Sequence, residues 1–91
     1  MAAPKGTTHV RLSPAMRLQW EQAQDAHVLL APEGMVQLNQ NAAVILGMCD
    51  GSRSAGDIAR ELTSRFGGDT LADDVHEFLA AARGHGWIVN V

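Results

Sequence analysis

The side chains best suited to chemistry are scattered along this sequence and do not share the spacing that a catalytic or metal site requires. Cys49 is the only cysteine, so it can form neither a disulfide within the chain nor a cysteine-based metal site. It falls near the expected end of a helix and beside Asp50, and both features disfavour the thiolate needed for nucleophilic attack. We therefore interpret Cys49 as a small buried apolar residue.

The histidines, carboxylates, serines and glycines show no catalytic pattern either. The four histidines form no HxxxH pair and do not stand at ligand spacing from the cysteine. One helix is expected to carry a polar cluster: Asp73, Asp74, His76 and Glu77. Such a cluster could bind a metal ion, but it is more often the solvated face of an amphipathic helix. No GxSxG motif or glycine-rich phosphate loop occurs, so we expect no enzymatic activity, no metal and no cofactor.

The elements that would position these side chains begin with strands. Short alternating runs of apolar and polar residues predict extended segments at HVRLSP, RLQWEQ, HVLLA and MVQLN. In the last of these, Met35 to Leu38, we expect Val36 and Leu38 to face inward. Pro32-Glu33-Gly34 has the composition of a tight turn. Consecutive strands joined by such short turns are expected to pair as an antiparallel meander.

The second half of the chain has the periodicity of helices. Asn39 is a candidate N-cap for a helix over 40–49, and Asp50-Gly51 is expected to stop it. Two [ST]-x-x-[DE] capping patterns precede further helices: Ser54 to Asp57 and Thr70 to Asp73.

Each helix is expected to bury one apolar stripe. The expected stripes are Ala42, Ile45, Leu46 and Cys49; then Ile58, Leu62 and Phe66; then Leu71, Val75, Phe78, Leu79 and Ala82. WIVNV is expected to be an extended tail whose Trp87 packs on the core. Strands followed by helices indicate an α+β domain, an N-terminal three-stranded antiparallel sheet followed by a three-helix bundle. We expect a flexible tail over 1–8 and a single domain over 9–91.

The composition excludes several classes of protein. Apolar residues make up 46% of the chain and charged residues 19%, as in soluble globular proteins. The net charge of −3 and seven scattered basic residues argue against a large nucleic-acid footprint. The apolar run AAVILGMC is far shorter than the about 20 residues of a membrane span, and MAAPKGTT lacks the apolar core of a signal peptide. With its lone cysteine, the protein is expected to be cytoplasmic.

Three non-enzymatic roles remain open. A winged-helix DNA-binding regulator normally begins its recognition helix with Lys, Arg, Asn or Gln, whereas the third helix here begins with Asp73 and Asp74. A domain from a larger fusion protein is a second alternative. A peptide-binding module is the third, because the open edge of a small sheet can accept an extended chain. The pattern alone leaves open whether the Gln37 N–H faces such an edge. An edge could also pair with its own copy, so a monomer and a homodimer are both compatible with the sequence.

Several stretches, in this order, also resemble a known family: LSPAMRLQWEQAQ (12–24), LLAPEGMVQLN (29–39), AAVILGMCDG (42–51), DIARELTSRF (57–66) and DVHEFLAAARGHGW (74–87). The family is PqqD, the peptide chaperone of pyrroloquinoline quinone (PQQ) biosynthesis. The RLQWE run, the PEG turn, the CDG helix end and the late Gly-Trp carry the resemblance.

The resemblance implies a protein without catalytic activity. It would bind the ribosomally made precursor peptide PqqA and present it to the radical SAM enzyme PqqE. The implied fold is the RiPP recognition element, a winged-helix-like domain in which the peptide adds beside the third strand and lies against the third helix. On this sequence the helix is 71–83. The residues expected to bind the peptide are Met35, Val36, Gln37, Leu38, Asp73, Asp74, Glu77, Phe78 and Ala81.

Overall fold

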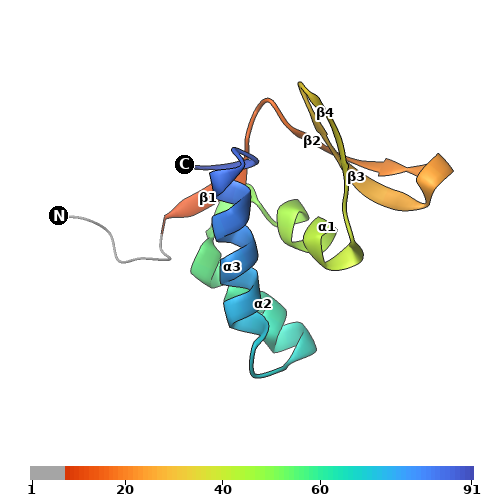
Figure 1. Ribbon diagram of the computed structural model, residues 1–91. Helices are drawn as coiled ribbons and strands as arrows, with labels where there is room; N and C mark the ends of the chain where they lie inside the picture. The colour runs from red at the N-terminus through yellow and green to blue at the C-terminus, as the bar shows by residue number, and fades with distance from the viewer. Residues whose placement is uncertain (1–7) are drawn as a thin grey trace.

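The computed structural model describes residues 8–91, which form two three-stranded antiparallel sheets and three α-helices (Figure 1). The elements in chain order are β1 (His9–Leu12), β2 (Arg17–Glu21), the short 3-10 helix η1 (Gln22–Gln24), β3 (Ala26–Ala31), β4 (Gly34–Gln37), α1 (Gln40–Gly47), β5 (Asp50–Ser54), α2 (Ala55–Phe66), α3 (Leu71–Gly84) and β6 (Ile88–Asn90). The α+β prediction is confirmed. The tail predicted over residues 1–8 lies outside the described residues, apart from Thr8.

The first sheet is the predicted meander, with strand order β2-β3-β4. Ala31 pairs with Gly34 across the Pro32-Glu33 turn. Gly34 has a φ of +153°, a conformation that favours glycine because a side chain would be strained there. The turn predicted from Pro32-Glu33-Gly34 is therefore confirmed.

The second sheet corrects the predicted arrangement. Its strand order is β5-β1-β6, so β1 does not belong to the meander. Residues 50–54 were expected to separate two helices, yet they form β5, and the expected C-terminal tail forms β6 against β1. The composition of β5, DGSRS, has little intrinsic strand preference. Pairing with β1, far away in sequence, supplies the backbone hydrogen bonds that overrule this preference. The comparison with a winged helix stays a prediction.

One hydrophobic core joins both sheets and all three helices. Its fully buried side chains are Leu29, Leu46, Ile58, Leu79, Ile88, Val10, Val28 and Val75. The stripe predicted for α1 is buried, and Leu71, Phe78 and Trp87 pack against the core while remaining partly exposed. One predicted inward residue is wrong. Phe66 is 70% exposed because α2 ends at Phe66 and the chain leaves the core there. Val36 is 36% exposed, although it lies opposite the buried Leu29.

Two of the three predicted helix caps are confirmed. The Ala42 N–H donates to the Asn39 side chain over 2.8 Å. Ser54 and Asp57 form the full capping box, with both hydrogen bonds at 3.0 Å. The predicted Thr70 cap is wrong, since its side chain makes no capping hydrogen bond. Thr70 already has helical backbone angles, whereas a capping hydroxyl works from an extended residue.

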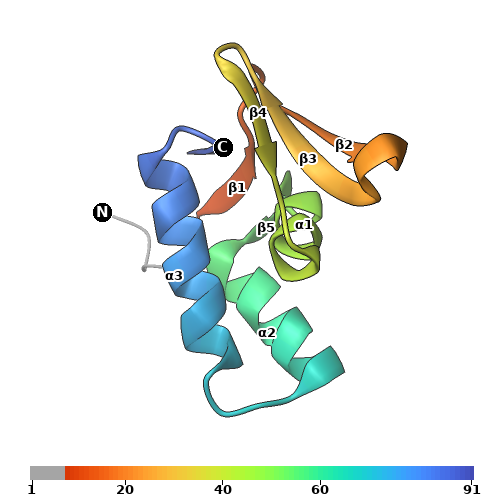
Figure 2. The same cartoon turned by 45° about the vertical axis from the view of Figure 1, so that its right-hand side comes forward.

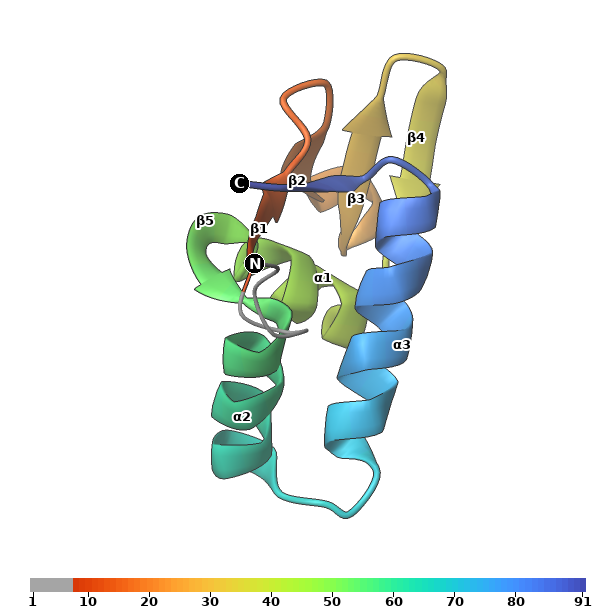
Figure 3. The same cartoon turned by 90° about the vertical axis from the view of Figure 1, so that its left-hand side faces the viewer.

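Of the strands of the meander, β4 lies on the side of α3. In Figure 2 the edge of the meander nearer to α3 is β4, and β2 lies on the far side. Figure 3 shows α1 between the meander and the helical pair α2 and α3. The tertiary structure therefore brings the two predicted halves of the site, a strand and a helix far apart in sequence, to one side of the molecule.

Candidate peptide-binding site

β4 is one of the two outer strands of the meander, the other being β2, and it has a free edge. Within residues 8–91 it pairs only with β3. All four of its residues are exposed, including Met35 at 49%. Such an edge can extend the sheet by one strand if a partner offers an extended backbone.

The backbone groups of β4 alternate between this free edge and β3. The Leu38 N–H donates to the His27 carbonyl over 2.9 Å, which makes this residue pair a hydrogen-bonded one. In an antiparallel ladder, hydrogen-bonded and non-hydrogen-bonded residue pairs alternate. In the next pair the backbone N–H and C=O groups therefore point away from the partner strand, and in the pair after that they bond to it again. Given the register Gln37↔Val28 and Val36↔Leu29, Val36 bonds to β3. The N–H and C=O groups of Gln37, and likewise of Met35, therefore point outward. The structure answers the question about Gln37 that the sequence left open.

The side chains of β4 alternate as well. Val36 lies opposite Leu29 on the face that packs on the core, whereas Met35 and Gln37 project from the other face. Leu38 comes just after β4 and is a core residue, 7% exposed. Met35 and Gln37 are thus the predicted strand residues whose backbone groups are open to a partner.

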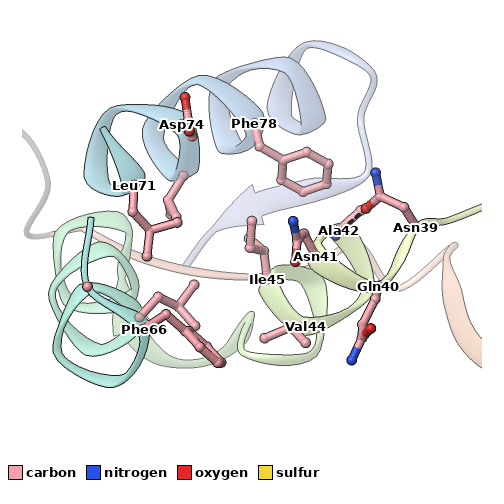
Figure 4. Close-up of a pocket in the computed structure, with 13 residues that line it drawn as sticks. Asn39, Gln40, Asn41, Ala42, Val44, Ile45, Phe66, Leu71, Asp74 and Phe78 are labelled. Carbon is pink, nitrogen blue, oxygen red and sulfur yellow. Dashed lines mark hydrogen bonds between the residues drawn. The ribbon is translucent and has the colours of Figure 1, made fainter. Parts of the chain in front are cut away.

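A groove lies between α1, the end of α2 and α3 (Figure 4), and it reaches Asn39, two residues after the end of β4. Its volume is about 560 Å³, which is large enough for several side chains of an extended peptide. In Figure 4 Phe78 points from α3 toward Asn41 and Ile45 of α1, and Leu71 points toward the end of α2, where Phe66 lies. The lining residues are Asn39, Gln40, Asn41, Ala42, Val44, Ile45, Leu62, Phe66, Gly67, Leu71, Asp74, Val75 and Phe78.

The α3 residues predicted to bind a peptide fall into two groups. Asp74 and Phe78 line the groove, and the exposed Ala81 follows them at helical spacing on the same flank. Asp73 and Glu77 are exposed and do not line the groove. Successive helical residues differ by about 100°, which turns Asp73 toward solvent. A role for each of these side chains in binding stays a prediction.

The sequence-based site omitted the contribution of α1. Its first residues, Gln40 and Asn41, together with the cap Asn39, bring amide side chains to the groove, and Val44 and Ile45 supply apolar ones. The run of three amide residues in the sequence is a signal for this part of the site. The sequence gives no signal that α1 faces α3 across a groove, because the two helices are distant in sequence.

The site is suited to binding and has little nucleophilic or metal chemistry. Among residues 8–91, Asp74 is the only charged residue that lines the groove. Burial, assisted by the charge of Asp50, raises the pKa of Cys49 to about 11, so its thiol is inert near neutral pH. This agrees with its interpretation as a small buried residue, 4% exposed. In the described part of the chain no three His, Cys, Asp or Glu side chains gather as metal ligands. Nor does any helix there have the length and apolar character to cross a bilayer.

Comparison with solved structures defines the class of fold. The solution NMR structure of the PqqD truncation of PqqCD from Methylobacterium extorquens, described as a functional and stand-alone RiPP recognition element, is similar with a TM-score of 0.74 and 29% identity. The match covers 96% of this chain and 95% of that one. The crystal structure of PqqD from Xanthomonas campestris matches with 31% identity and a TM-score of 0.52, over 93% and 94% of the chains. The fold is therefore PqqD-like.

Comparison with known sequences then identifies the family. Residues 26–88 match the family model for coenzyme PQQ synthesis protein D (PqqD). A protein from Azotobacter vinelandii named PqqA binding protein is 52% identical over 79 residues, 86% of each chain. One of the same name from Methylococcus capsulatus is 43% identical over 81 residues, covering 89% of this chain and 87% of the relative. The chain belongs to the PqqD family, and the resemblance noted from its motifs is confirmed.

Proposed function

We propose that this protein binds the precursor peptide PqqA in PQQ biosynthesis by accepting it as an added strand on the free edge of β4. The observation that carries the proposal is the outward direction of the Met35 and Gln37 backbone groups. Two residues after Gln37, Asn39 lines the same groove as Phe78. The names of the curated relatives, which are PqqA binding proteins, supply the identity of the peptide.

Binding by strand addition divides the work between backbone and side chains. Outward N–H and C=O groups of β4 would pair with the peptide backbone and give affinity without regard to sequence. Alternate peptide side chains would then face the groove, where Phe78 and Asp74 lie, and these would give specificity. A free peptide that becomes ordered on binding loses several kcal/mol of the interaction energy, so moderate affinity is expected.

The protein would act as a chaperone that presents the peptide to the radical SAM enzyme PqqE. A peptide held at one end by β4 raises the effective concentration of its remaining part at the active site of the enzyme. No catalytic group of this protein is needed for such a role. The proposal also places the protein in the cytoplasm, where ribosomal peptides are made. A homodimer formed through β4 would compete with the peptide for the same edge, so the binding species would be a monomer or a dimer joined elsewhere.

A role as a DNA-binding regulator gains no support from the site. The first turn of α3 carries Asp73 and Asp74, both exposed, and these would repel phosphates. In the described part of the chain no basic side chain lines the groove, whereas nucleic-acid sites concentrate Lys and Arg.

An NMR titration of the isotopically labelled protein with synthetic PqqA tests the binding site. We expect the largest amide shifts in residues 34–38 and along the groove flank of α3, within 71–83. A scrambled peptide of the same composition serves as the control and should cause only small shifts. Shifts confined to β1, β5 and β6 would refute the site.

Presentation needs a second measurement, because binding alone does not establish it. PqqE should modify PqqA faster in the presence of this protein than in its absence, and a Gln37→Pro variant that binds the peptide weakly should lose this gain. An equal rate with and without the protein would refute presentation and leave binding intact.

A further inference from the structure

The end of the groove farthest from β4 is an apolar hollow that the strand-addition site does not require. We call it the distal pocket, and its residues are Val44, Phe66 and Leu71. Val44 is 38% exposed and Phe66 is 70% exposed, while Leu71 is partly buried against the core. All three line the same groove as Phe78. Figure 4 shows Leu71 and Phe66 close to each other, with Val44 on the opposite wall.

Phe66 is exposed because of its place at the end of a helix. It is the last residue of α2, and Gly67 turns the chain away with a φ of +73°. The space around Gly67 is open, because a Cβ placed there would meet no heavy atom within 4 Å. A polar residue would be favoured at such a position in water. Clustered apolar side chains that stay exposed mark surfaces that bind a partner.

The groove connects the distal pocket with the residues that follow β4. Asn39, two residues after Gln37, lines one part of the groove, and Phe66 lines another. In Figure 4 Phe78 points toward Asn41 and Leu71 toward Phe66, both from α3. Phe78 and Leu71 are about two helical turns apart, or roughly 10 Å. An extended peptide covers about 3.3 Å per residue, so about three residues bridge the two positions.

We propose that the distal pocket binds an apolar side chain of the same peptide, about three residues along the chain from the side chain that sits over Phe78. This inference rests on the proposed function. Between the two anchors the peptide would pass the charged side chain of Asp74, which lines the groove. A basic or neutral peptide residue fits there, and an acidic one would be repelled. Recognition would then combine a paired strand with a separate apolar anchor.

The affinity of the full-length protein for synthetic PqqA, measured by titration calorimetry, tests the distal pocket. Phe66→Ser is expected to weaken binding about tenfold, as for a buried apolar anchor. The variant should fold normally because Phe66 is mostly exposed. Val91→Ser is the matched control, since it removes another apolar side chain, 67% exposed, outside the groove lining. It should leave the affinity unchanged.

The peptide itself supplies the second arm of the test. Each apolar residue of PqqA is replaced by alanine, and binding is measured to the wild type and to Phe66→Ser. We expect one replacement that weakens binding to the wild type about tenfold but has little further effect on the variant. Such non-additivity is the signature of two side chains in contact.

The outcomes separate the inference from the function on which it rests. If Gln37→Pro weakens binding but Phe66→Ser does not, the distal pocket is refuted and strand addition stands. If the wild type binds no PqqA, or if neither variant changes the affinity, strand addition itself fails. If Phe66→Ser leaves the affinity unchanged but abolishes the acceleration of PqqE, the pocket contacts the enzyme and the inference is wrong.

Discussion

The two sheets have the same number of strands and opposite construction. The meander β2-β3-β4 uses consecutive strands, and its outer strand β4 is exposed along its whole length. The sheet β5-β1-β6 gathers strands from the beginning, middle and end of the chain. Its side chains include Val10, Ser54 and Ile88, which are 0%, 2% and 1% exposed. The meander exposes the side chains of its outer strand β4 to solvent, and the other sheet ties distant segments to the core.

This difference assigns the two sheets different roles. A strand that closes the fold must bury its side chains, because the hydrophobic effect stabilises long-range pairing against the entropy of the chain. A strand that accepts a partner must keep backbone groups unsatisfied within the chain, and only exposed positions tolerate this. Substitutions in the sheet β5-β1-β6 should therefore change stability, and those along β4 and in the groove should change binding.

The largest expected effect is a difference in stability between two variants, one at a buried side chain of β6 and one at an exposed side chain of β4. Ile88→Ala in β6 should lower the free energy of unfolding by about 3 kcal/mol, because it leaves a cavity in the core. Met35→Ala in β4 should change it by less than about 0.5 kcal/mol. Chemical denaturation followed by circular dichroism measures both. Similar losses for the two variants would contradict the division of roles.

A pair of proline variants tests the alternation along β4. Val36→Pro removes an N–H that bonds to β3 and should cost about 2 kcal/mol of stability. Gln37→Pro removes an N–H that points outward. Edge strands tolerate proline at such positions, so the free energy of unfolding should change little. The substitution should instead weaken PqqA binding about tenfold.

The control for this pair is Gln37→Ala, which retains the N–H. It should bind PqqA nearly as well as the wild type. If Gln37→Pro proved the less stable of the two proline variants, the assignment of the outward groups would be reversed.

Two neighbouring alanines of α3 test the orientation of the helix. Ala81→Arg places a long side chain where the peptide is expected to lie against α3. It should therefore weaken PqqA binding about tenfold. Ala80→Arg adds the same side chain about 100° around the helix, toward solvent, and should leave the affinity unchanged. Both alanines are exposed, so neither change should unfold the protein. Equal effects of the two would place the peptide away from this flank.

The N-caps of α2 and α3 should differ in their contribution to stability, and this difference is smaller than the ones above. Ser54→Ala breaks the capping box between β5 and α2 and should cost about 1 kcal/mol of stability. Thr70→Ala, at the start of α3, should cost almost nothing, because Thr70 makes no capping hydrogen bond. Thermal unfolding of both variants measures the difference. A loss at Thr70 as large as at Ser54 would show that its hydroxyl caps α3 in solution.

The pH dependence of the same capping box is the smallest expected effect. Hydrogen bonds from Ser54, first from its backbone N–H and then from its side chain, lower the pKa of Asp57 below its ordinary value of 3.8. The stabilisation is therefore fully present above pH 3.8 and is lost as the pH falls through the lowered pKa of the folded state. The stability difference between the wild type and Asp57→Asn should be constant near neutral pH and should shrink in acid. A difference that grew in acid would contradict this sign.

Local features were predictable because their physics lies within a few residues. The Asn39 and Ser54 caps need a side-chain oxygen only three positions before the N–H that it accepts from. The Pro32-Glu33-Gly34 turn follows from the backbone preferences of its residues. The resemblance to the PqqD family likewise predicted that a peptide binds between a strand and a helix. It is the basis for assigning the site to β4 and α3.

The parts that sequence reasoning missed depend on contacts between distant residues. The strand β5 forms because β1 lies beside it, and its composition gives no sign of this. Phe66 has the spacing of a core residue, yet it falls at the last position of α2, where the core has ended. Periodicity describes one helix at a time and carries no information on where a neighbouring helix stops.

By itself, the sequence determined the α+β class, the meander, the helix caps and the PqqD family, because short-range preferences and ordered motifs encode them. Only the tertiary structure decided that β1 leaves the meander, that the Gln37 N–H points outward and that α1 completes the groove with α3. Those outcomes depend on register and on packing between segments far apart in the chain. The free energies of such pairings are settled only when the whole core assembles.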